Sequence, residues 1–203
     1  AFADGRSSHS GRRKALLIDP KMLVLTPCVR DKETLICMEH NYKDAQIKSV
    51  CNNDAKFLHL LMNCPSVLQR LNEVPTEQQD WIDAINEWAH DDDEEDYIVF
   101  DGNTPIGWLG VNGILGEDKT AYLKMAVFLP DYQGHGFGSF AILELMSRLK
   151  HRGYERIVLY TDSDNDKAQG CYKKCGFRIV ESLVETMSNG MEVSRLKMEA
   201  CLL

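Results

Sequence analysis

The 203-residue sequence lacks the patterns that define several large classes of protein. No apolar run approaches the roughly 18 residues of a membrane-spanning helix, and the opening AFADGRSSHS has no apolar segment like that of a secretion signal. An excess of positive charge is also absent, because 23 Lys and Arg stand against 31 Asp and Glu, for a net charge of −8. These features predict a soluble, cytoplasmic protein that binds neither membrane nor nucleic acid, and they suit a cationic ligand.

Cysteine and histidine occur without the spacing of metal ligands. The 7 cysteines form no Cys-x-x-Cys pair and the 6 histidines are scattered, so we predict no metal. Reduced, partly buried thiols that act as small apolar side chains are the expected state. Cys171 and Cys175 are four residues apart, which places both on one face of a short helix. Packing in the core is the simplest interpretation of that pair.

The chain is predicted to form one domain after a tail. Residues 1–20 mix Gly, Ser and Arg without periodicity, and residues 21–203 contain no repeat and one core. Strands are predicted at 22–25, 97–100, 105–111, 120–128, 156–161, 177–186 and 191–200. Helical spacing appears near 35–38, 54–62, 66–71, 138–152 and 168–174. The strands at 120–128 and 156–161 are expected to be parallel because a crossover helix joins them.

Two stretches in the middle of the chain carry polar patterns. Thr76 and Gln79 form a capping-box pattern, with Thr76 starting a helix whose apolar face runs from Trp81 to Trp88. Core packing is the simplest interpretation of both tryptophans, and the alternative is that one walls a substrate pocket. The six acids at 91–96 repel one another and predict a solvated loop, with attraction of a polycationic ligand as the alternative.

A glycine-rich turn organises the rest of the sequence. It lies between the strand that ends near Phe128 and the helix that starts near Gly138, and it reads Gln133, Gly134, His135, Gly136, Phe137, Gly138, Ser139. A helix that opens with glycines leaves its first backbone N–H groups bare, and these donors join the positive end of the helix dipole to form an anion site. Phosphate or pyrophosphate is the expected occupant. The P-loop ending is missing, and the turn comes too late for a dinucleotide fingerprint.

The pattern Gln-x-x-Gly-x-Gly at 133–138 resembles the acyl-CoA-binding motif of the GNAT superfamily of N-acetyltransferases. A second motif follows, since the family's Asn-x-x-Ala-x-x-x-Tyr-x-x-x-Gly-Phe matches Asn165, Ala168, Tyr172, Gly176 and Phe177. The resemblance covers residues 22–200. Within the superfamily, the layout of the chain is similar to that of the branches that acetylate ribosomal-protein N-termini and small amines. The resemblance implies the GNAT fold, an α/β (mixed α+β) architecture whose mostly antiparallel, seven-stranded sheet is flanked by helices.

The resemblance also implies an activity and a site. Acetyl-CoA would be the cosubstrate, and a primary amine on a small molecule or peptide would attack the thioester directly in a ternary complex. Ala126, Val127 and Phe128 would pair with pantetheine and supply an oxyanion-binding N–H, the turn at 133–139 would hold the pyrophosphate, and Asn165 would lie against the pantetheine arm. Tyr172 would protonate the leaving thiolate, which is feasible because a phenol pKa of about 10 lies close to a thiol pKa of about 8.5.

Several alternatives stay open at this point. Asn165 by itself indicates a helix cap, and Tyr172 a packed tyrosine with a wet hydroxyl. Family members that acetylate protein N-termini often carry a glutamate five residues before the matching Asn, where this chain has Tyr160. Asp162, Tyr160, Glu73 or water would then relay the acceptor's proton, or the acceptor binds neutral, which favours an α-amine.

The protein is expected to be a monomer or homodimer. A catalytically silent acyl-CoA-binding regulatory module is the main alternative function. A nucleotide phosphotransferase is a third, but a Lys and a Mg²⁺-binding Asp are missing at the expected places.

Overall fold

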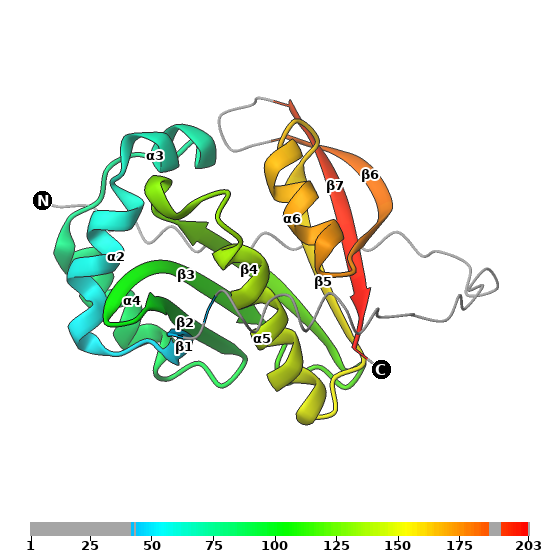
Figure 1. Ribbon diagram of the computed structural model, residues 1–203, viewed down its shortest axis with the longest axis horizontal. Helices are drawn as coiled ribbons and strands as arrows, with labels where there is room; N and C mark the ends of the chain where they lie inside the picture. The colour runs from blue at the N-terminus through cyan, green and yellow to red at the C-terminus, as the bar shows by residue number, and fades with distance from the viewer. Residues whose placement is uncertain (1–41, 43, 187–191, 203) are drawn as a thin grey trace, which may run out of the picture.

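The computed structural model describes residues 42, 44–186 and 192–202. They contain one seven-stranded sheet with helices on both faces (Figure 1). The strand order is β1-β2-β3-β4-β5-β7-β6, and β4 with β5 is the parallel pair while the other neighbours are antiparallel. This confirms the predicted mixed, mostly antiparallel fold. The strands are β1 Ala45–Ser49, β2 Glu94–Asp101, β3 Thr104–Asn112, β4 Thr120–Phe128, β5 Arg156–Asp162, β6 Arg178–Thr186 and β7 Glu192–Cys201.

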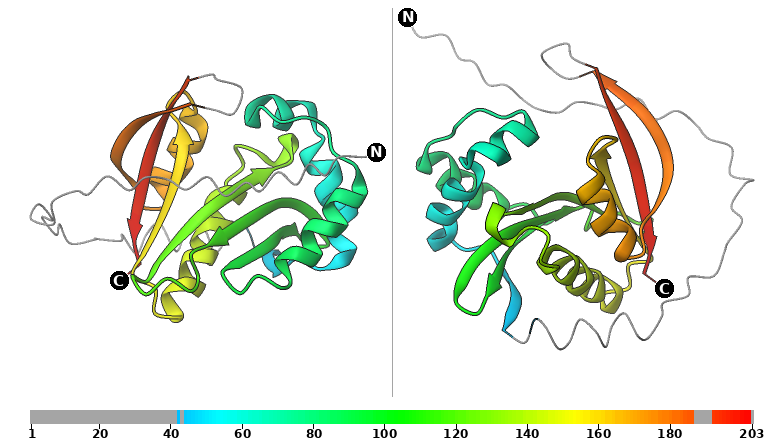
Figure 2. Two further views of the ribbon diagram at one scale, coloured as in Figure 1. Left: turned by 180° about the vertical axis from the view of Figure 1, so that it is seen from behind. Right: turned by 45° about the horizontal axis from the view of Figure 1, so that its top comes forward.

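Each face of the sheet buries its own cluster of apolar side chains. On one face, α5 (Phe137–His151) and α6 (Asp166–Lys174) cover the sheet, as Figure 2 shows in its right-hand view. On the other face, α2 (Ala55–Met62), α3 (Pro65–Leu71) and α4 (Gln78–Trp88) pack over β2 to β4. Side chains alternate along a strand, so neighbours such as Ile98 and Val99 belong to opposite clusters. The sheet thus forms the middle of three layers.

Helix α5 has the inward face that its sequence predicts. The side chains at the helical spacing are at most 1% exposed, namely Ala141, Ile142, Leu145, Met146 and Leu149. The helix ends before Gly153, whose φ of +87° is a left-handed value that glycine adopts without strain. The predicted end of the helix is therefore confirmed. Helix α5 connects β4 to β5, and the two strands are parallel.

The first strand among the described residues, β1, is not one that the sequence predicts. β1 has one buried side chain, Ile47, in five residues, and a stretch so short has no clear alternation. Its pairing with β2 along the full length of β1 stabilises it. The predicted strand at 22–25, the helical segment at 35–38, the tail at 1–20 and the connection between the last two predicted strands lie outside the described residues.

Helix α4 begins one residue later than the capping pattern predicts. Glu77 is the N-cap, and its backbone N–H donates to Asp80 Oδ2 at 2.8 Å. The Thr76 hydroxyl instead accepts from Trp81 Nε1 at 2.9 Å and from the Asn63 amide at 3.3 Å, which ties the start of α4 to the end of α2. Trp81 packs in the core cluster of this face, as expected.

The prediction of a solvated loop at 91–96 is wrong for half of its residues. Positions 94 to 96 open strand β2, and Asp96 is 6% exposed. Trp108 Nε1 donates to Asp96 Oδ1 at 2.7 Å, and Lys124 Nζ lies 3.5 Å from Asp96 Oδ2 and also contacts Glu94. Burial raises the pKa of Asp96 to about 7. Because these partners come from β3 and β4, the local sequence pattern does not indicate that Asp96 is buried.

A β-bulge and a glycine make room for this buried ion pair. Gly110 pairs with Met125 and Val111 with Leu123, which leaves Lys124 as the extra residue of β4. The Lys124 ammonium lies 5.0 Å from the Trp88 ring centroid. A Cβ on Gly110 would lie 2.4 Å from Lys124 Cε and 2.8 Å from Asp96 Oδ1. Gly110 is therefore required by the close approach of two charged side chains.

Trp108→Phe is expected to lower the free energy of unfolding by about 1–3 kcal/mol, because Asp96 Oδ1 loses its donor inside the core. An ionised carboxylate needs a donor more than a neutral one, and burial raises the Asp96 pKa to about 7, so the loss should be larger at pH 8 than at pH 6. Urea unfolding at both pH values measures this. Trp81→Phe is the matched control, since Trp81 donates to the neutral Thr76 hydroxyl; equal, pH-independent losses in both variants would contradict the argument.

Candidate functional site

Strands β4 and β5 pair over three positions and then diverge (Figure 1). Pairing joins Thr120–Tyr122 to Arg156–Val158, although β4 continues to Phe128 and β5 to Asp162. The expected pantetheine-binding residues Ala126, Val127 and Phe128 lie on the diverging part of β4, where their other edge pairs with β3. The edge that faces β5 therefore keeps backbone groups available for an extended ligand.

The glycine turn follows β4 through the short 3₁₀ helix η2 (Pro130–Tyr132). Gln133 Nε2 donates to the Phe128 carbonyl at 2.8 Å, which fastens the start of the turn to the end of the strand. Gly134 and Gly136 have φ values of +80° and +91°, and Gly136 is the N-cap of α5. The turn that the sequence predicts is thus present, with glycine where the backbone is left-handed.

The turn presents a row of backbone donors. Among the described residues, no N–H of positions 134–139 donates a backbone hydrogen bond, whereas the Phe140 N–H already binds the Gly136 carbonyl. The positive end of the α5 dipole adds to these donors. Such a row suits an anion with several oxygens, of which a diphosphate is one.

Tyr42 packs over this turn, a contact that the sequence analysis missed. Its hydroxyl donates to the His135 carbonyl at 2.6 Å, and its ring centroid lies 5.3 Å from that of Phe137. A Cβ on Gly136 would lie 1.9 Å from the Tyr42 hydroxyl oxygen. The contact spans 93 positions along the chain, so no local signal could have found it.

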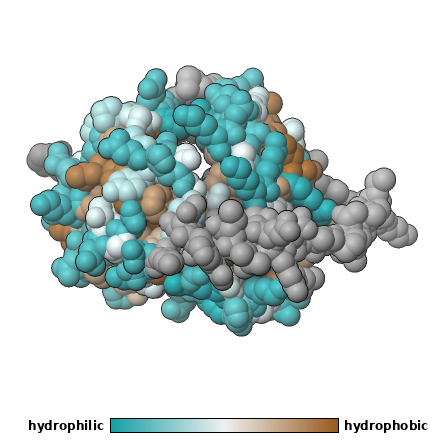
Figure 3. Space-filling view, viewed as in Figure 1, coloured by the Kyte–Doolittle hydropathy of each residue, from teal (hydrophilic) through white to brown (hydrophobic). Residues whose placement is uncertain are grey.

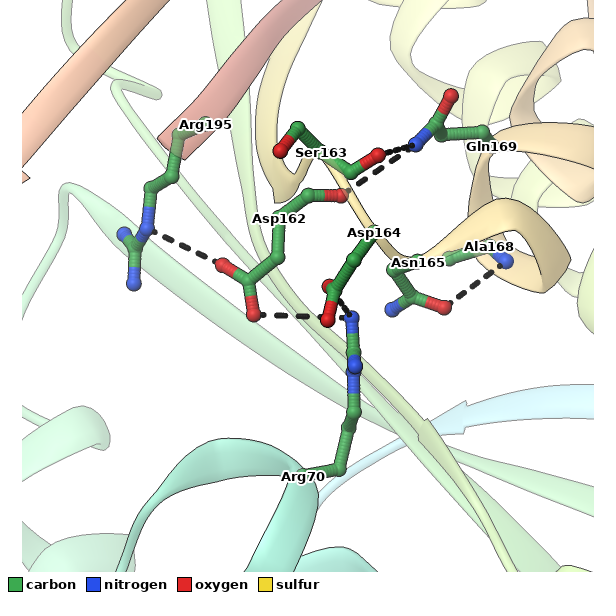
Figure 4. Close-up of polar contacts among 8 residues, drawn as sticks. All are labelled: Arg70, Asp162, Ser163, Asp164, Asn165, Ala168, Gln169 and Arg195. Carbon is green, nitrogen blue, oxygen red and sulfur yellow. Dashed lines mark hydrogen bonds and ion pairs between the residues drawn. The ribbon is translucent and has the colours of Figure 1, made fainter. Parts of the chain in front are cut away.

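Asn165 is the N-cap of α6, as its residue type by itself indicates. Its side-chain oxygen accepts from the Ala168 N–H at 3.2 Å (Figure 4). Gln169, which is 7% exposed, donates to the Ser163 carbonyl at 3.0 Å and fixes the loop between β5 and α6. The loop that carries Asn165 is therefore rigidly held at the end of β5.

Tyr172 lies on α6 and is half-buried. Its ring centroid is 5.8 Å from that of Phe177. Burial raises the pKa of the Tyr172 phenol well above its usual value, and Cys171, Cys175 and the β4 residue Tyr122 raise it further. The phenol is therefore protonated at neutral pH and has a proton to donate.

An ion-pair network crosses from α3 to the loop after β5 (Figure 4). Arg70 Nη2 lies 2.7 Å from Asp164 Oδ1 and 3.7 Å from Asp162 Oδ2. Arg195 Nε of β7 lies 3.3 Å from Asp162 Oδ1. Both oxygens of Asp162 thus face guanidinium groups. No sequence pattern points to Arg70, because its partner Asp164 lies 94 positions away in the chain.

The three candidate bases are not equally placed. Asp162 is engaged by the two arginines. Glu73 is exposed just beyond the end of α3. The Tyr160 ring packs against Tyr122, with centroids 5.9 Å apart, where the two strands separate. None of these contacts singles out one residue as a proton acceptor.

Two further properties bear on the kind of site. The described residues include no group of three or more His, Cys, Asp or Glu that could hold a metal ion. In the same part of the chain, no helix has the length and apolar character needed to cross a membrane.

A sheet whose parallel central strands diverge beside a glycine turn and a helix N-terminus is an arrangement suited to an extended, anionic ligand. The chain belongs to the acetyltransferase (GNAT) family, whose model matches residues 56–177. The cosubstrate of this family is acetyl-CoA.

Relatives of known structure or function share this family. A spermidine N(1)-acetyltransferase from Vibrio cholerae is 27% identical over 151 residues, which are 68% of this chain and 82% of that protein. The crystal structure of the Vibrio cholerae spermidine N-acetyltransferase in complex with CoA and spermine has a TM-score of 0.71 at 24% identity, covers 79% of this chain and 96% of the other, and shows the same fold.

A mycothiol acetyltransferase from Saccharomonospora viridis is 41% identical over 56 residues, or 28% of this chain. The chain spans 18% of that protein and 22% of a second mycothiol acetyltransferase, from Corynebacterium aurimucosum.

Proposed function

We propose that the protein is an N-acetyltransferase that moves the acetyl group of acetyl-CoA to a primary amine by direct attack in a ternary complex. The observation that carries the proposal is that β4 and β5 separate after three paired positions, that among the described residues the N–H groups of positions 134–139 donate no backbone hydrogen bond, and that α6, which carries the protonated phenol of Tyr172, follows β5. In this arrangement the turn at 133–139 binds the diphosphate. Pantetheine lies between Ala126–Phe128 and Asn165.

The proposed reaction uses each of these groups once. The neutral amine nitrogen attacks the thioester carbonyl carbon, and a backbone N–H of β4 binds the oxygen as it gains negative charge. The carbon–sulfur bond then breaks, and Tyr172 gives its proton to the departing thiolate. The proton lost by the amine passes to water, and the phenol regains a proton from solvent.

The acceptor is proposed to be an amine that loses its proton readily. Both carboxylate oxygens of Asp162 form ion pairs with arginines. Tyr160 occupies the position at which family members that acetylate protein N-termini often carry a glutamate. Without a dedicated base, about one part in seven of an α-amine is neutral at pH 7, against about one part in 2,500 of a lysine-like amine. This favours peptide α-amines and other weakly basic amines.

The acceptor amine, rather than a side chain, should therefore set the pH dependence. We expect kcat/KM for the acceptor to rise about tenfold per pH unit until pH reaches the pKa of that amine, about 7.8 for a peptide and about 10.4 for an alkylamine. Thiol release measured from pH 6 to 9 with both acceptors tests this. A plateau at one pH for both amines, lost in Tyr160→Phe, Asp162→Asn or Glu73→Gln, would instead identify a base.

The proposed function itself is tested by thiol release from acetyl-CoA with a panel of amines and by a mass gain of one acetyl group on the acceptor. The tyrosine at 160 also favours a second candidate, a regulatory module that binds acyl-CoA without turnover. CoA binding by calorimetry with no turnover on any amine would favour that module, and absence of CoA binding would exclude both.

A further inference from the structure

Two thiols and a hydroxyl meet directly behind the glycine turn. Cys171 Sγ lies 3.3 Å from Ser139 Oγ on the first turn of α5, and Cys175 Sγ lies 3.6 Å from the Ser139 carbonyl oxygen. Cys175 is buried, whereas Cys171 is half-buried and reachable by solvent. The proposed acetyl transfer uses neither thiol.

The surroundings of Cys171 favour its thiolate. The neighbouring Cys175 side chain is the main cause that lowers the pKa of Cys171 to about 7; burial opposes it, while the Ser139 hydroxyl and the positive charge of Lys174 add to it. The first turn of α5, with the positive end of its dipole, faces the same sulfur. The thiolate is the reactive form of cysteine, so these surroundings favour reaction at Cys171.

The position of Cys171 gives its modification a structural consequence. A Cβ on Gly138 would already lie 3.3 Å from Cys171 Sγ, so the sulfur fills the space behind the turn. A group added to this sulfur must push into the turn at 134–139 or shift α6. Helix α6 carries Tyr172 as the very next residue. Either movement disturbs the proposed cofactor site.

We propose that Cys171 is a thiol-modification site at which small disulfides of the glutathione type form a mixed disulfide and close the glycine turn to its anionic ligand. The Cys171 thiolate attacks one sulfur of the disulfide, so that one sulfur–sulfur bond forms as another breaks, and the released thiolate takes a proton from water. Thiol and disulfide numbers are unchanged. That the adduct also excludes CoA rests on the proposed function of the turn.

The modification is tested on the full chain with glutathione disulfide alone, in the absence of CoA. Peptide mass mapping over time should locate the first adduct on Cys171, with a rate that reaches half its maximum near pH 7. Cys171→Ser should abolish this adduct, and Cys175→Ser should move the midpoint to higher pH. Cys51→Ser is the matched control, because Cys51 is exposed and lies just before α2 rather than on α5 or α6. An adduct that forms first on Cys51 or Cys64, with Cys171 unmodified, would overturn the proposal.

The consequence for the turn is measured separately by calorimetry with CoA. The purified adduct should bind CoA at least tenfold more weakly than the reduced protein, dithiothreitol should restore binding, and free CoA should slow labelling of Cys171 but not of Cys51. Unchanged CoA affinity in the adduct would refute the blocking effect. Normal labelling of Cys171 in a protein that never binds CoA would refute the proposed function and leave the modification site standing.

Discussion

Replacing Tyr172 with Phe is expected to lower kcat for acetyl transfer by a factor of about 10² to 10³. The substitution removes one hydroxyl and keeps the ring, which packs 5.8 Å from the Phe177 ring centroid. The departing thiolate would then leave without a proton donor, whereas the turn and the β4 edge are untouched. The Kd for CoA should therefore stay within about twofold, and thiol release together with calorimetry measures both quantities.

Tyr154→Phe is the control for this substitution. The Tyr154 hydroxyl donates to the Ile114 carbonyl, beyond the far end of α5 from the glycine turn, so its loss should lower stability and leave kcat unchanged. If Tyr172→Phe kept more than half of the wild-type kcat, the phenol would not be the proton donor. If it lost CoA binding in proportion to rate, the hydroxyl would serve the fold of the site instead.

Gly134→Ala is expected to raise the Kd for CoA by about tenfold to a hundredfold, or about 1.4–2.8 kcal/mol. The φ of +80° at Gly134 is strained for alanine, and relaxing that strain would turn the N–H groups of the turn away from the diphosphate. Because chemistry occurs further along the pantetheine arm, kcat at saturating acetyl-CoA should change much less than KM. Calorimetry with CoA and initial rates over a range of acetyl-CoA concentrations measure the two effects.

Gly153→Ala provides a closely matched comparison. Gly153 has a φ of +87°, and a Cβ added at either glycine would meet nothing within 4 Å, but Gly153 follows the opposite end of α5. Both variants should lose about 1 kcal/mol of stability in urea unfolding, since each forces alanine into a left-handed conformation. CoA affinity should fall at position 134 alone. An equal loss of affinity in both variants would indicate a general effect of instability.

The parts of the site that the sequence predicts are those determined locally. A strand, a glycine turn and a helix N-terminus are adjacent in the chain, so their residue pattern and the spacing from Gln133 to Tyr172 were enough to place them. The same holds for the inward face of α5 and the cap at Asn165. In each case the residue type is the one that the local backbone conformation favours, as glycine is favoured by the positive φ at Gly136.

What the sequence could not reveal depends on partners far away in the chain. The burial of Asp96 follows from Trp108 and Lys124 on two other strands, and six acids in a row otherwise indicate solvent. Tyr42 over the turn and Arg70 across the loop after β5 are likewise tertiary contacts. A short strand such as β1, with one buried side chain, exists because β2 offers it a partner. Local propensity has no information about such pairings.

Strand β6 adds an apolar region to the surface of the molecule. It is one of the two edge strands of the described sheet, and Ile179, Val180 and Val184 are 43%, 44% and 63% exposed. Figure 3 shows apolar surface gathered over this strand on the right of the view. An exposed, apolar edge strand can pair with a strand of another molecule. We therefore expect self-association to increase with protein concentration.

The place of β7 in the sheet has a consequence for how the chain acquires its structure during synthesis. β7 lies between β5 and β6 and pairs with β5 from Arg156 to Asp162. A nascent chain that has already emerged through α6 therefore holds every residue of the proposed cofactor site, yet β5 has an open edge and Met198 is missing from the core. Assembly must wait for residues 192–202 to leave the ribosome, and pairing over such sequence separations is slow.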